Sequence, residues 1–221
     1  MPGMEITAEK LMSCPLFAGM NTESVNESLR FLSPRRAEYG KGEYLQIRGD
    51  AASAFGLIVY GGVALFCDDN SGDRNLAARI GENRVFGESA AFSPGGADMS
   101  AVAEEKTGVL WFSASAVTEF ILSDIPSGRV FAVNLLRVSA ENRRETAEKV
   151  AHMGRRTTKN KLLSYLHAQS RRCGSAEFDI PFSRQQLADY LAVERSAMSA
   201  VLSNMVRSGE LKCRKSHFTL R

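Results

Sequence analysis

Short apolar runs alternate with glycine-rich turns between residues 37 and 112, and this alternation is the strongest constraint on the fold. The runs are four to six residues long, a length typical of strands and too short for helices. They cover residues 44–47, 55–60, 63–67, 76–80 and 109–112. The turn signals are residues 40–42, 49–50, 61–62, 69–72, 81–83 and 94–96. Many short strands at this spacing predict a β-sandwich or a jelly-roll barrel.

Helical patterns flank this β region on both sides. Residues 5–33 carry apolar side chains such as Leu11, Leu16, Val25 and Leu29 and predict helical structure. After Phe112 the β pattern stops. Residues 115–123 then predict a short helix that ends near residues 124–126.

A long helix is predicted from about residue 127 to residue 152. Neither Gly nor Pro occurs between Arg129 and Met153, and the first half is apolar on most faces. A helix of about 25 residues is about 38 Å long, which is more than one small domain can cover. One side is therefore expected to meet another chain, although the pattern also fits a helix lying wholly across the barrel. Gly154 is a candidate hinge to the last part of the chain.

Residues 183–205 have the pattern of two short helices joined by a tight turn. Ser183 is followed three residues later by Gln186, which is the capping-box signature of a helix start. Residues 192–194 suit the turn, and Gly209 ends the second helix. The predicted buried positions are Leu187, Ala188, Leu191, Ala197, Met198, Val201, Leu202 and Met205. Residues 211–220 are typical of a two-stranded wing, so the pattern predicts a winged helix-turn-helix; the alternative is an ordinary αα-hairpin.

The opposite face of the second helix carries side chains that are small or basic, namely Arg195, Ser196, Ser199, Ala200 and Ser203. Such side chains suit a major groove about 12 Å wide, because bulky or acidic ones would clash or repel phosphate. Arg195 can donate two hydrogen bonds to guanine O6 and N7, and Ser196 and Ser199 can reach bases or phosphates. Arg184 and Lys215, the latter at the basic tip of the wing, complete the residues expected to contact double-stranded DNA.

The net charge of +3 hides a division of the chain into two parts. Residues 154–221 hold 13 Lys and Arg against 5 Asp and Glu, a net charge of +8. Residues 1–153 hold 15 against 20, a net charge of −5. A basic terminal third on an acidic body indicates a polyanion-binding module attached to a different domain. A basic solvated surface is the alternative.

In the order and spacing of its motifs, nearly the whole chain resembles the catabolite-activator/FNR-type (Crp/Fnr) family of bacterial transcription regulators. The matching phrases are residues 15–19 (PLFAG), 39–43 (YGKGE), 48–50 (RGD), 85–88 (VFGE), 157–166 (TTKNKLLSYL) and 183–191 (SRQQLADYL). The resemblance implies a cyclic-nucleotide-binding-like β-roll that senses an effector and a homodimer joined by the long helix. It also implies a winged helix that binds a near-palindromic operator.

The chain departs from the family pattern in the pocket phrase. Cyclic-AMP-binding members have an Arg that neutralises the cyclic phosphate, and Met99 stands at that position, next to Asp98. A buried phosphate without a charged partner is costly, so cyclic AMP is disfavoured and another small-molecule effector is expected. The residues expected to line its pocket are Glu88, Ser89, Met99 and Ser100; the alternative is that they only build the barrel.

A second departure lies in the recognition helix. The family pattern Arg-Glu-x-x-x-Arg reads here as Arg195, Ser196 and Ala200, so the first Arg remains while the Glu and the second Arg are lost. The operator is therefore expected to differ from the best-known consensus.

The residues that metals and cofactors need are scarce in the predicted barrel. Cys14 and Cys67 are the only cysteines before the long helix, whereas a four-cysteine iron–sulfur cluster needs four ligands. His152 is the first of three histidines, which disfavours haem and a cupin-like metalloenzyme. No catalytic arrangement or paired-cysteine metal motif occurs. Redox reactivity of Cys14 or Cys67 is left open.

These patterns together predict an α+β chain with three parts. Residues 1–126 are expected to form the effector-binding β-roll domain (a jelly roll) with flanking helices, residues 127–153 the dimerisation helix, and residues 154–221 the winged helix-turn-helix. No apolar run reaches the roughly 18 to 20 residues of a membrane span, and the N-terminus has no signal-peptide pattern, so a cytoplasmic protein is expected. The predicted partners are operator DNA, a second copy of the chain and, for an activator, RNA polymerase. A constitutive DNA-binding protein with a vestigial barrel remains an alternative.

Overall fold

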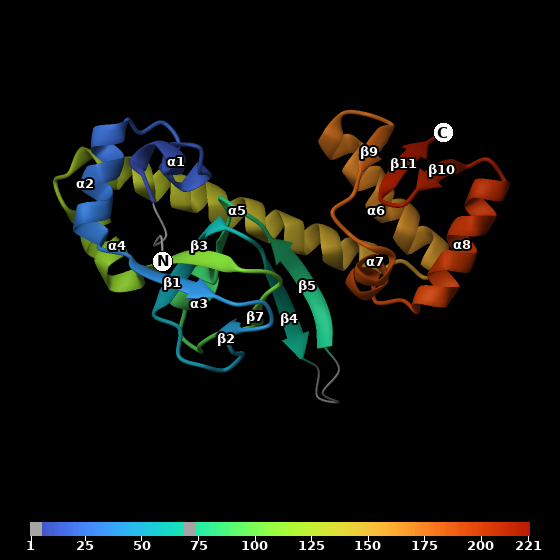
Figure 1. Cartoon of the computed structure of the whole chain (residues 1–221), viewed down its shortest axis with the longest axis horizontal. Helices are drawn as coiled ribbons and strands as arrows, with labels where there is room; N and C mark the ends of the chain where they lie inside the picture. Colours follow the sequence, from blue (N-terminus) through green and yellow to red (C-terminus); the bar gives the residue numbers. More distant parts are fainter. Residues whose placement is uncertain (1–5, 69–73) are drawn as a thin grey trace. The chain divides into compact units, whose positions relative to one another are not determined.

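The computed structural model describes residues 6–68 and 74–221, so the predicted turn at residues 69–72 lies outside the described residues (Figure 1). The chain divides into two compact units, Met1–Arg143 and Arg144–Arg221. Helices and antiparallel strands occur in both units. This arrangement confirms the predicted α+β class with a β domain, a long helix and a C-terminal helix-turn-helix.

The β domain of the first unit is a roll of two four-stranded sheets in which hydrogen-bonded neighbours are antiparallel. One sheet has the order β1-β8-β3-β6 and the other β2-β7-β4-β5. The strands are β1 (Arg35–Tyr39), β2 (Tyr44–Gln46), β3 (Ala54–Tyr60), β4 (Val63–Asp68), β5 (Arg74–Ile80), β6 (Val85–Phe86), β7 (Ser100–Ala103) and β8 (Thr107–Ser113). The jelly-roll-like barrel predicted from the alternating runs is therefore present.

The unbroken apolar runs of β3 and β8 follow from their position between two cores. Both strands are buried on both faces. Leu57 and Phe112 face a core shared with the helices, whereas Ile58 and Trp111 face the interior of the roll. A strand covered on both sides needs apolar residues at successive positions, which is why these two strands lack an alternating pattern.

Three strands of the roll do not stand out as apolar runs. β1 is an edge strand whose side chains include Arg35, Arg36 and Glu38, all exposed. β6 is only two residues long, and β7 carries Ser100 and two alanines. An edge position, a very short length or small side chains leave a strand without the run of large apolar residues by which strands are predicted.

The predicted helical segment at residues 5–33 is divided into three pieces in the structure. They are α1 (Ala8–Met12), the 3-10 turn η1 (Pro15–Phe17) and α2 (Thr22–Leu32). Pro15 lacks a backbone N–H and begins a new turn, and Gly19 has a φ of 77°, a left-handed conformation that glycine adopts without steric cost. The segment is therefore helical as predicted, in three short pieces.

Two further helices follow the roll, close to where the sequence predicts them. They are α4 (Ala114–Leu122) and α5 (Pro126–Met153). The first half of α5 packs against the first unit through Phe131, whose ring lies 5.7 Å from that of Phe17 and 5.8 Å from that of Phe120. Buried Asn134 donates hydrogen bonds to the carbonyls of Leu16 and Ala18. The last ten residues of α5 belong to the second unit.

The second unit packs three further helices with a small sheet. The helices are α6 (Thr158–Cys173), α7 (Arg184–Leu191) and α8 (Arg195–Arg207), and the strands are β9 (Glu177–Asp179), β10 (Leu211–Arg214) and β11 (His217–Leu220). The sheet has the order β10-β11-β9. The predicted two-stranded wing is thus a three-stranded sheet, because the short segment around Phe178 pairs with β11.

Candidate functional site

α7 and α8 form the predicted helix-turn-helix. Ser183 accepts a hydrogen bond from the backbone of Gln186, and the Gln186 side chain accepts one from the backbone of Ser183, so the capping box is complete. Ala192 makes the turn with a φ of 48°. The buried positions are Leu187, Ala188, Leu191, Met198, Leu202 and Met205. Two predicted core positions differ: Ala197 is exposed and Val201 is only half-buried, because both lie at the edge of the buried face.

The opposite face of α8 is open in this unit. Arg195, Ser196, Ala200 and Ser203 are exposed, and Ser199 is half-buried. The structure therefore brings the five predicted DNA-contacting residues of α8 together on one surface. Arg195 is the longest side chain of this set and the only one with a charge.

The serine hydroxyls on this face donate their protons within the helix-turn-helix. Ser199 donates to the Arg195 carbonyl and Ser203 to the Ser199 carbonyl, both at 2.9 Å. Ser196 donates to the carboxylate of Glu194. In this arrangement the serine oxygens are acceptors, so the donors offered to a base or phosphate must come mainly from Arg195.

The wing carries the other predicted contacts, and they are not equivalent. Lys215 is exposed at the tip between β10 and β11, with a φ of 55°. Arg184 is half-buried; its guanidinium lies 5.0 Å from the centre of the Phe218 ring and donates to the Cys213 sulfur at 3.3 Å. Arg184 thus fastens α7 to the wing, a structural role that the sequence pattern did not indicate.

The predicted effector residue Glu88 is buried at the start of α3 (Glu88–Ala91), and it faces the long helix. The Asn142 side chain on α5 donates to the Glu88 carboxylate at 2.8 Å and to the Val85 carbonyl at 3.1 Å. Arg84 donates to the Asn142 amide oxygen at 3.0 Å. We call these four residues the Asn142 clasp. Asn142 was not a predicted site residue, because its partners lie more than 50 positions away.

The remaining predicted effector residues have different surroundings. Ser89 is exposed, while Met99 is half-buried against the apolar interior of the roll. Ser100 is buried, and its hydroxyl accepts the backbone N–H of Arg48 at 3.1 Å. Ser89 therefore differs from the three pocket candidates that lie within the protein.

Gln46, which the sequence did not single out, connects the two predicted pocket segments. Its amide nitrogen donates to the Met99 carbonyl at 3.2 Å. Its amide oxygen lies 3.1 Å from the position that a Cβ on Gly87 would occupy. Gln46 therefore lies between the phrase around Glu88 and the start of β7.

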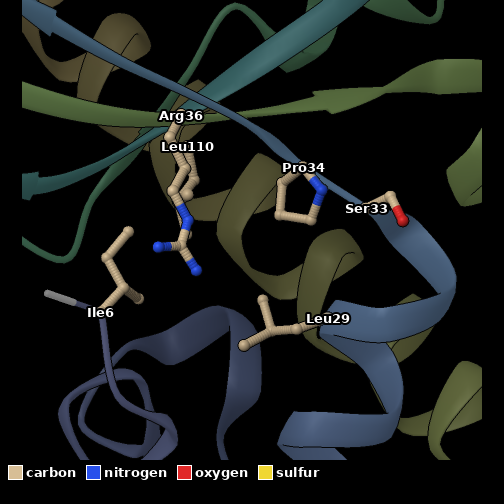
Figure 2. Close-up of a pocket in the computed structure, with 6 residues that line it drawn as sticks. All are labelled: Ile6, Leu29, Ser33, Pro34, Arg36 and Leu110. Carbon is tan, nitrogen blue, oxygen red and sulfur yellow. The ribbon is translucent and has the colours of Figure 1, made fainter. Parts of the chain in front are cut away.

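A cavity of about 250 Å³ lies elsewhere in the first unit, and Figure 2 shows its lining. The lining residues are Ile6, Leu29, Ser33, Pro34, Arg36 and Leu110. Leu110 faces the core shared with the helices and not the interior of the roll. The cavity contains none of the predicted effector residues.

Metal-ion clusters and membrane-spanning helices are both absent from residues 6–68 and 74–221. In these ranges, no group of three or more His, Cys, Asp or Glu side chains is placed to hold a metal ion. Among the same residues, no helix is both long and apolar enough to span a membrane.

Comparison with known proteins identifies both parts of the chain. Residues 36–124 match the cyclic nucleotide-binding domain family, and residues 160–221 match the Crp-like helix-turn-helix domain family. The cyclic AMP receptor protein of Thermus thermophilus is 27% identical over 198 residues, which cover 90% of this chain and 88% of that protein.

Solved structures agree with this assignment. The catabolite activator protein of Thermus thermophilus, known from a crystal structure, is 25% identical in sequence to this chain. The two structures match with a TM-score of 0.53 over 94% of this chain and 93% of that one. FixK2 from Bradyrhizobium japonicum shares the fold at 22% identity, with a TM-score of 0.64 and coverage of 85% and 92%. The chain therefore belongs to the Crp/Fnr family and is a Crp-like transcription regulator that joins a cyclic nucleotide-binding domain to a DNA-binding helix-turn-helix.

Proposed function

We propose that this regulator is a homodimer that binds a near-palindromic operator in double-stranded DNA and responds to a small-molecule effector other than cyclic AMP. The observation that carries the proposal is the exposed face of α8, where Arg195 stands among small side chains. A guanidinium can donate two hydrogen bonds to guanine O6 and N7 in the major groove. Ala200 and Ser203 leave room for the helix to approach the bases closely.

An exposed stripe along α5 supports the dimer. Its residues follow one another at alternating spacings of three and four: Val133, Leu136, Ala140, Arg143, Ala147 and Val150, all exposed. Leu136 is 71% exposed and Val150 is 65% exposed. This spacing is typical of the helix face that forms the contact in a two-stranded coiled coil. We call this stripe of six residues the seam. Covering Leu136 with a second copy of α5 removes its apolar surface from water, which is worth about 2 kcal/mol per chain.

A parallel pair of α5 helices would also suit DNA binding. Each α5 leads along the chain into its own helix-turn-helix unit, so in a parallel pair both helix-turn-helix units follow the same end of the paired helices. A dimer reads two half-sites about 34 Å apart, one turn of DNA. The operator is therefore expected to be near-palindromic.

The surroundings of Met99 support an effector other than cyclic AMP. The thioether packs against the apolar interior of the roll, and the neighbouring Ser100 hydroxyl already accepts the Arg48 backbone N–H. Met99 itself offers no cation to a cyclic phosphate placed beside it, and a phosphate buried without a charged partner is costly. We therefore propose a less anionic effector, although the relative from Thermus thermophilus is named a cyclic AMP receptor protein.

The Asn142 clasp offers a route from the effector to the long helix. Glu88 accepts a hydrogen bond from Asn142, which is next to Arg143 of the seam. An effector that hydrogen-bonds to the Glu88 carboxylate competes with Asn142 for it. Such an effector would break the contact between α5 and Glu88. Such an effector shifts the protein toward one state only by the difference in its affinity for the two states.

Dimerisation and operator binding are tested together. Double-stranded DNA is selected from a random pool by the full chain, and the mass of the protein is measured by light scattering. The wild-type protein should be a dimer and should enrich a near-palindromic sequence. Leu136→Lys places a charge in the seam and should give a monomer that binds this sequence weakly. Leu122→Lys is the matched control, because Leu122 is 79% exposed on α4, outside the seam.

The effector is tested by thermal unfolding in the presence of a metabolite collection that includes cyclic AMP. A ligand that binds only the folded protein must raise its apparent stability. Stabilisation by cyclic AMP alone would refute the proposed effector class. Operator binding with no stabilising ligand would favour the constitutive regulator with a vestigial barrel.

The proposal includes no catalytic role and no metal, haem or iron–sulfur cofactor. It places the protein in the cytoplasm with its DNA, and contact with RNA polymerase follows if the protein is an activator. Metal analysis of the purified protein tests the alternative of a jelly-roll metalloenzyme, which would contain a stoichiometric metal.

A further inference from the structure

The carboxylate of Glu194 occupies the N-terminus of the recognition helix α8. It accepts the backbone N–H of Ser196 at 2.8 Å and that of Ala197 at 2.7 Å, and it also accepts the Ser196 hydroxyl. The side chain of Glu194 is nevertheless exposed. The hydrogen bonds from the Ser196 side chain and from the two backbone N–H groups hold the pKa of this carboxyl below its usual range, so it is ionised at neutral pH.

This cap changes what the end of the helix can bind. The first N–H groups of a helix lack partners within the helix and, with the positive end of its dipole, commonly bind phosphate. Here two of those groups donate to Glu194, which adds a negative charge at the same place. A DNA phosphate is therefore repelled from this end of α8.

The same cap fixes an acceptor beside Arg195. In the first two turns of α8, residues 195–201, Arg195 is the only charged side chain, and the hydroxyls of Ser196 and Ser199 donate to protein acceptors. The N-terminal residues of a recognition helix are the ones that contact base edges. Glu194 and Arg195 are thus the two long polar side chains at the tip of the helix, one an acceptor and the other a donor.

We propose that Glu194 is a second specificity-determining residue of this surface, and that it accepts a hydrogen bond from the N4 amino group of a cytosine next to the guanine contacted by Arg195. Cytosine offers only a donor in the major groove, which matches a carboxylate. Guanine and thymine offer acceptors, and adenine places its N7 acceptor beside its amino group, so these bases are repelled. This inference rests on the proposed DNA-binding function.

The test compares the sequences selected from a random double-stranded pool by the wild-type full chain and by three variants. Glu194→Ser keeps an oxygen that can cap the helix but is too short to reach a base. Glu194→Gln keeps the length and replaces the carboxylate by an amide. Glu210→Ser is the control for charge alone, because Glu210 is an exposed carboxylate beyond the other end of α8, paired with Lys159.

The wild-type protein is expected to require cytosine at one position of each half-site. Glu194→Ser should lose this preference by about tenfold or more, which is within the range of one base contact, and should keep the guanine read by Arg195. Glu194→Gln should change the preference from cytosine to adenine, the base that an amide pairs with. Glu210→Ser should leave the consensus unchanged.

Two outcomes would overturn the inference. The first is that the Glu194→Ser protein selects the wild-type consensus and that its affinity rises by the same factor for every sequence. Glu194 would then be a helix cap only. The other is a Glu194→Gln protein with an unchanged cytosine preference, and this result decides the matter if Glu194→Ser does not fold. A wild-type protein that selects no sequence refutes the proposed function itself, so the two failures are distinguishable.

Discussion

Replacing Asn142 by Ala removes the central side chain of the Asn142 clasp. Three hydrogen bonds disappear, with lengths between 2.8 and 3.1 Å, and the Glu88 carboxylate, only 8% exposed, loses this donor. A hydrogen bond to a charged group contributes about 1.5 to 3 kcal/mol and a neutral one about 1 kcal/mol. Ala has a higher helix propensity than Asn by about 0.5 kcal/mol. Two of the three bonds have a charged partner, Glu88 or Arg84, and one is neutral, so the expected net loss of stability is about 3.5 to 6.5 kcal/mol.

The assay is urea unfolding followed by the fluorescence of Trp111. This is the only tryptophan of the chain, and it lies in the interior of the roll, so its emission reports on the first unit. The Asn142→Ala, Glu88→Ala and double variants form a thermodynamic cycle. A coupling energy of about 1.5 kcal/mol or more is expected, since the two side chains are in direct contact.

The matched control is Asn134→Ala on the same helix. Asn134 is also buried, but it donates to the carbonyls of Leu16 and Ala18 and not to a carboxylate. It should destabilise the first unit without coupling to Glu88. A coupling energy below about 0.5 kcal/mol between Asn142 and Glu88, the limit for independent sites, would refute the clasp as a stabilising contact.

Three further predictions concern single positions. Gly128→Ala should destabilise the first unit by about 2 kcal/mol in the same urea assay, because an added Cβ overlaps the carbonyl oxygen of Phe120. Hydrogen bonds to Glu177 and, to a smaller extent, to Asp179 raise the pKa of His217 above its usual value of 6.5. The stability that these hydrogen bonds contribute is therefore complete below pH 6.5 and is lost as the pH rises through the raised pKa. NMR titration of the imidazole ring checks the direction of the shift. Burial raises the pKa of the Cys14 thiol to about 11, so a thiol reagent should modify it only after unfolding.

Each of these predictions has a control and an outcome that contradicts it. An added Cβ at Gly81 meets no heavy atom within 4 Å, so equal losses from Gly81→Ala and Gly128→Ala would exclude the overlap as the cause. A ring pKa at or below 6.5 would contradict the pairing of His217. Exposed Cys67 should react in the folded protein, and equal rates for Cys67 and Cys14 would show that Cys14 is accessible.

Local signals explain why the helix-turn-helix was predictable in detail. The capping box of Ser183 and Gln186 spans three positions and is present as predicted. The buried and exposed faces of α8 follow the helical period, apart from Ala197 and Val201 at the edge of the buried face. Interactions between residues three or four positions apart depend only on the local backbone, so they can be read from the order of residues.

The partners of individual polar side chains were not predictable in this way. Arg184 is a basic residue of the helix-turn-helix and was expected to contact DNA. Its guanidinium packs on Phe218, 34 positions later. Glu88 was assigned to an effector pocket, and its hydrogen-bond donor is Asn142, 54 positions away. Which of several polar groups meets a given side chain depends on how strands and helices pack, and no sequence period records that choice.

The amino-acid sequence by itself determined the class of each region, because hydrophobic period, turn residues and caps act over a few positions. It predicted the roll of short strands, the long uninterrupted helix and the recognition helix with Arg195, and it showed the Met at position 99. Only the tertiary structure decided that Asn142 donates to Glu88 and that Arg184 packs on Phe218. The first contact needs α5 to pack against α3, and the second needs α7 to pack against the wing.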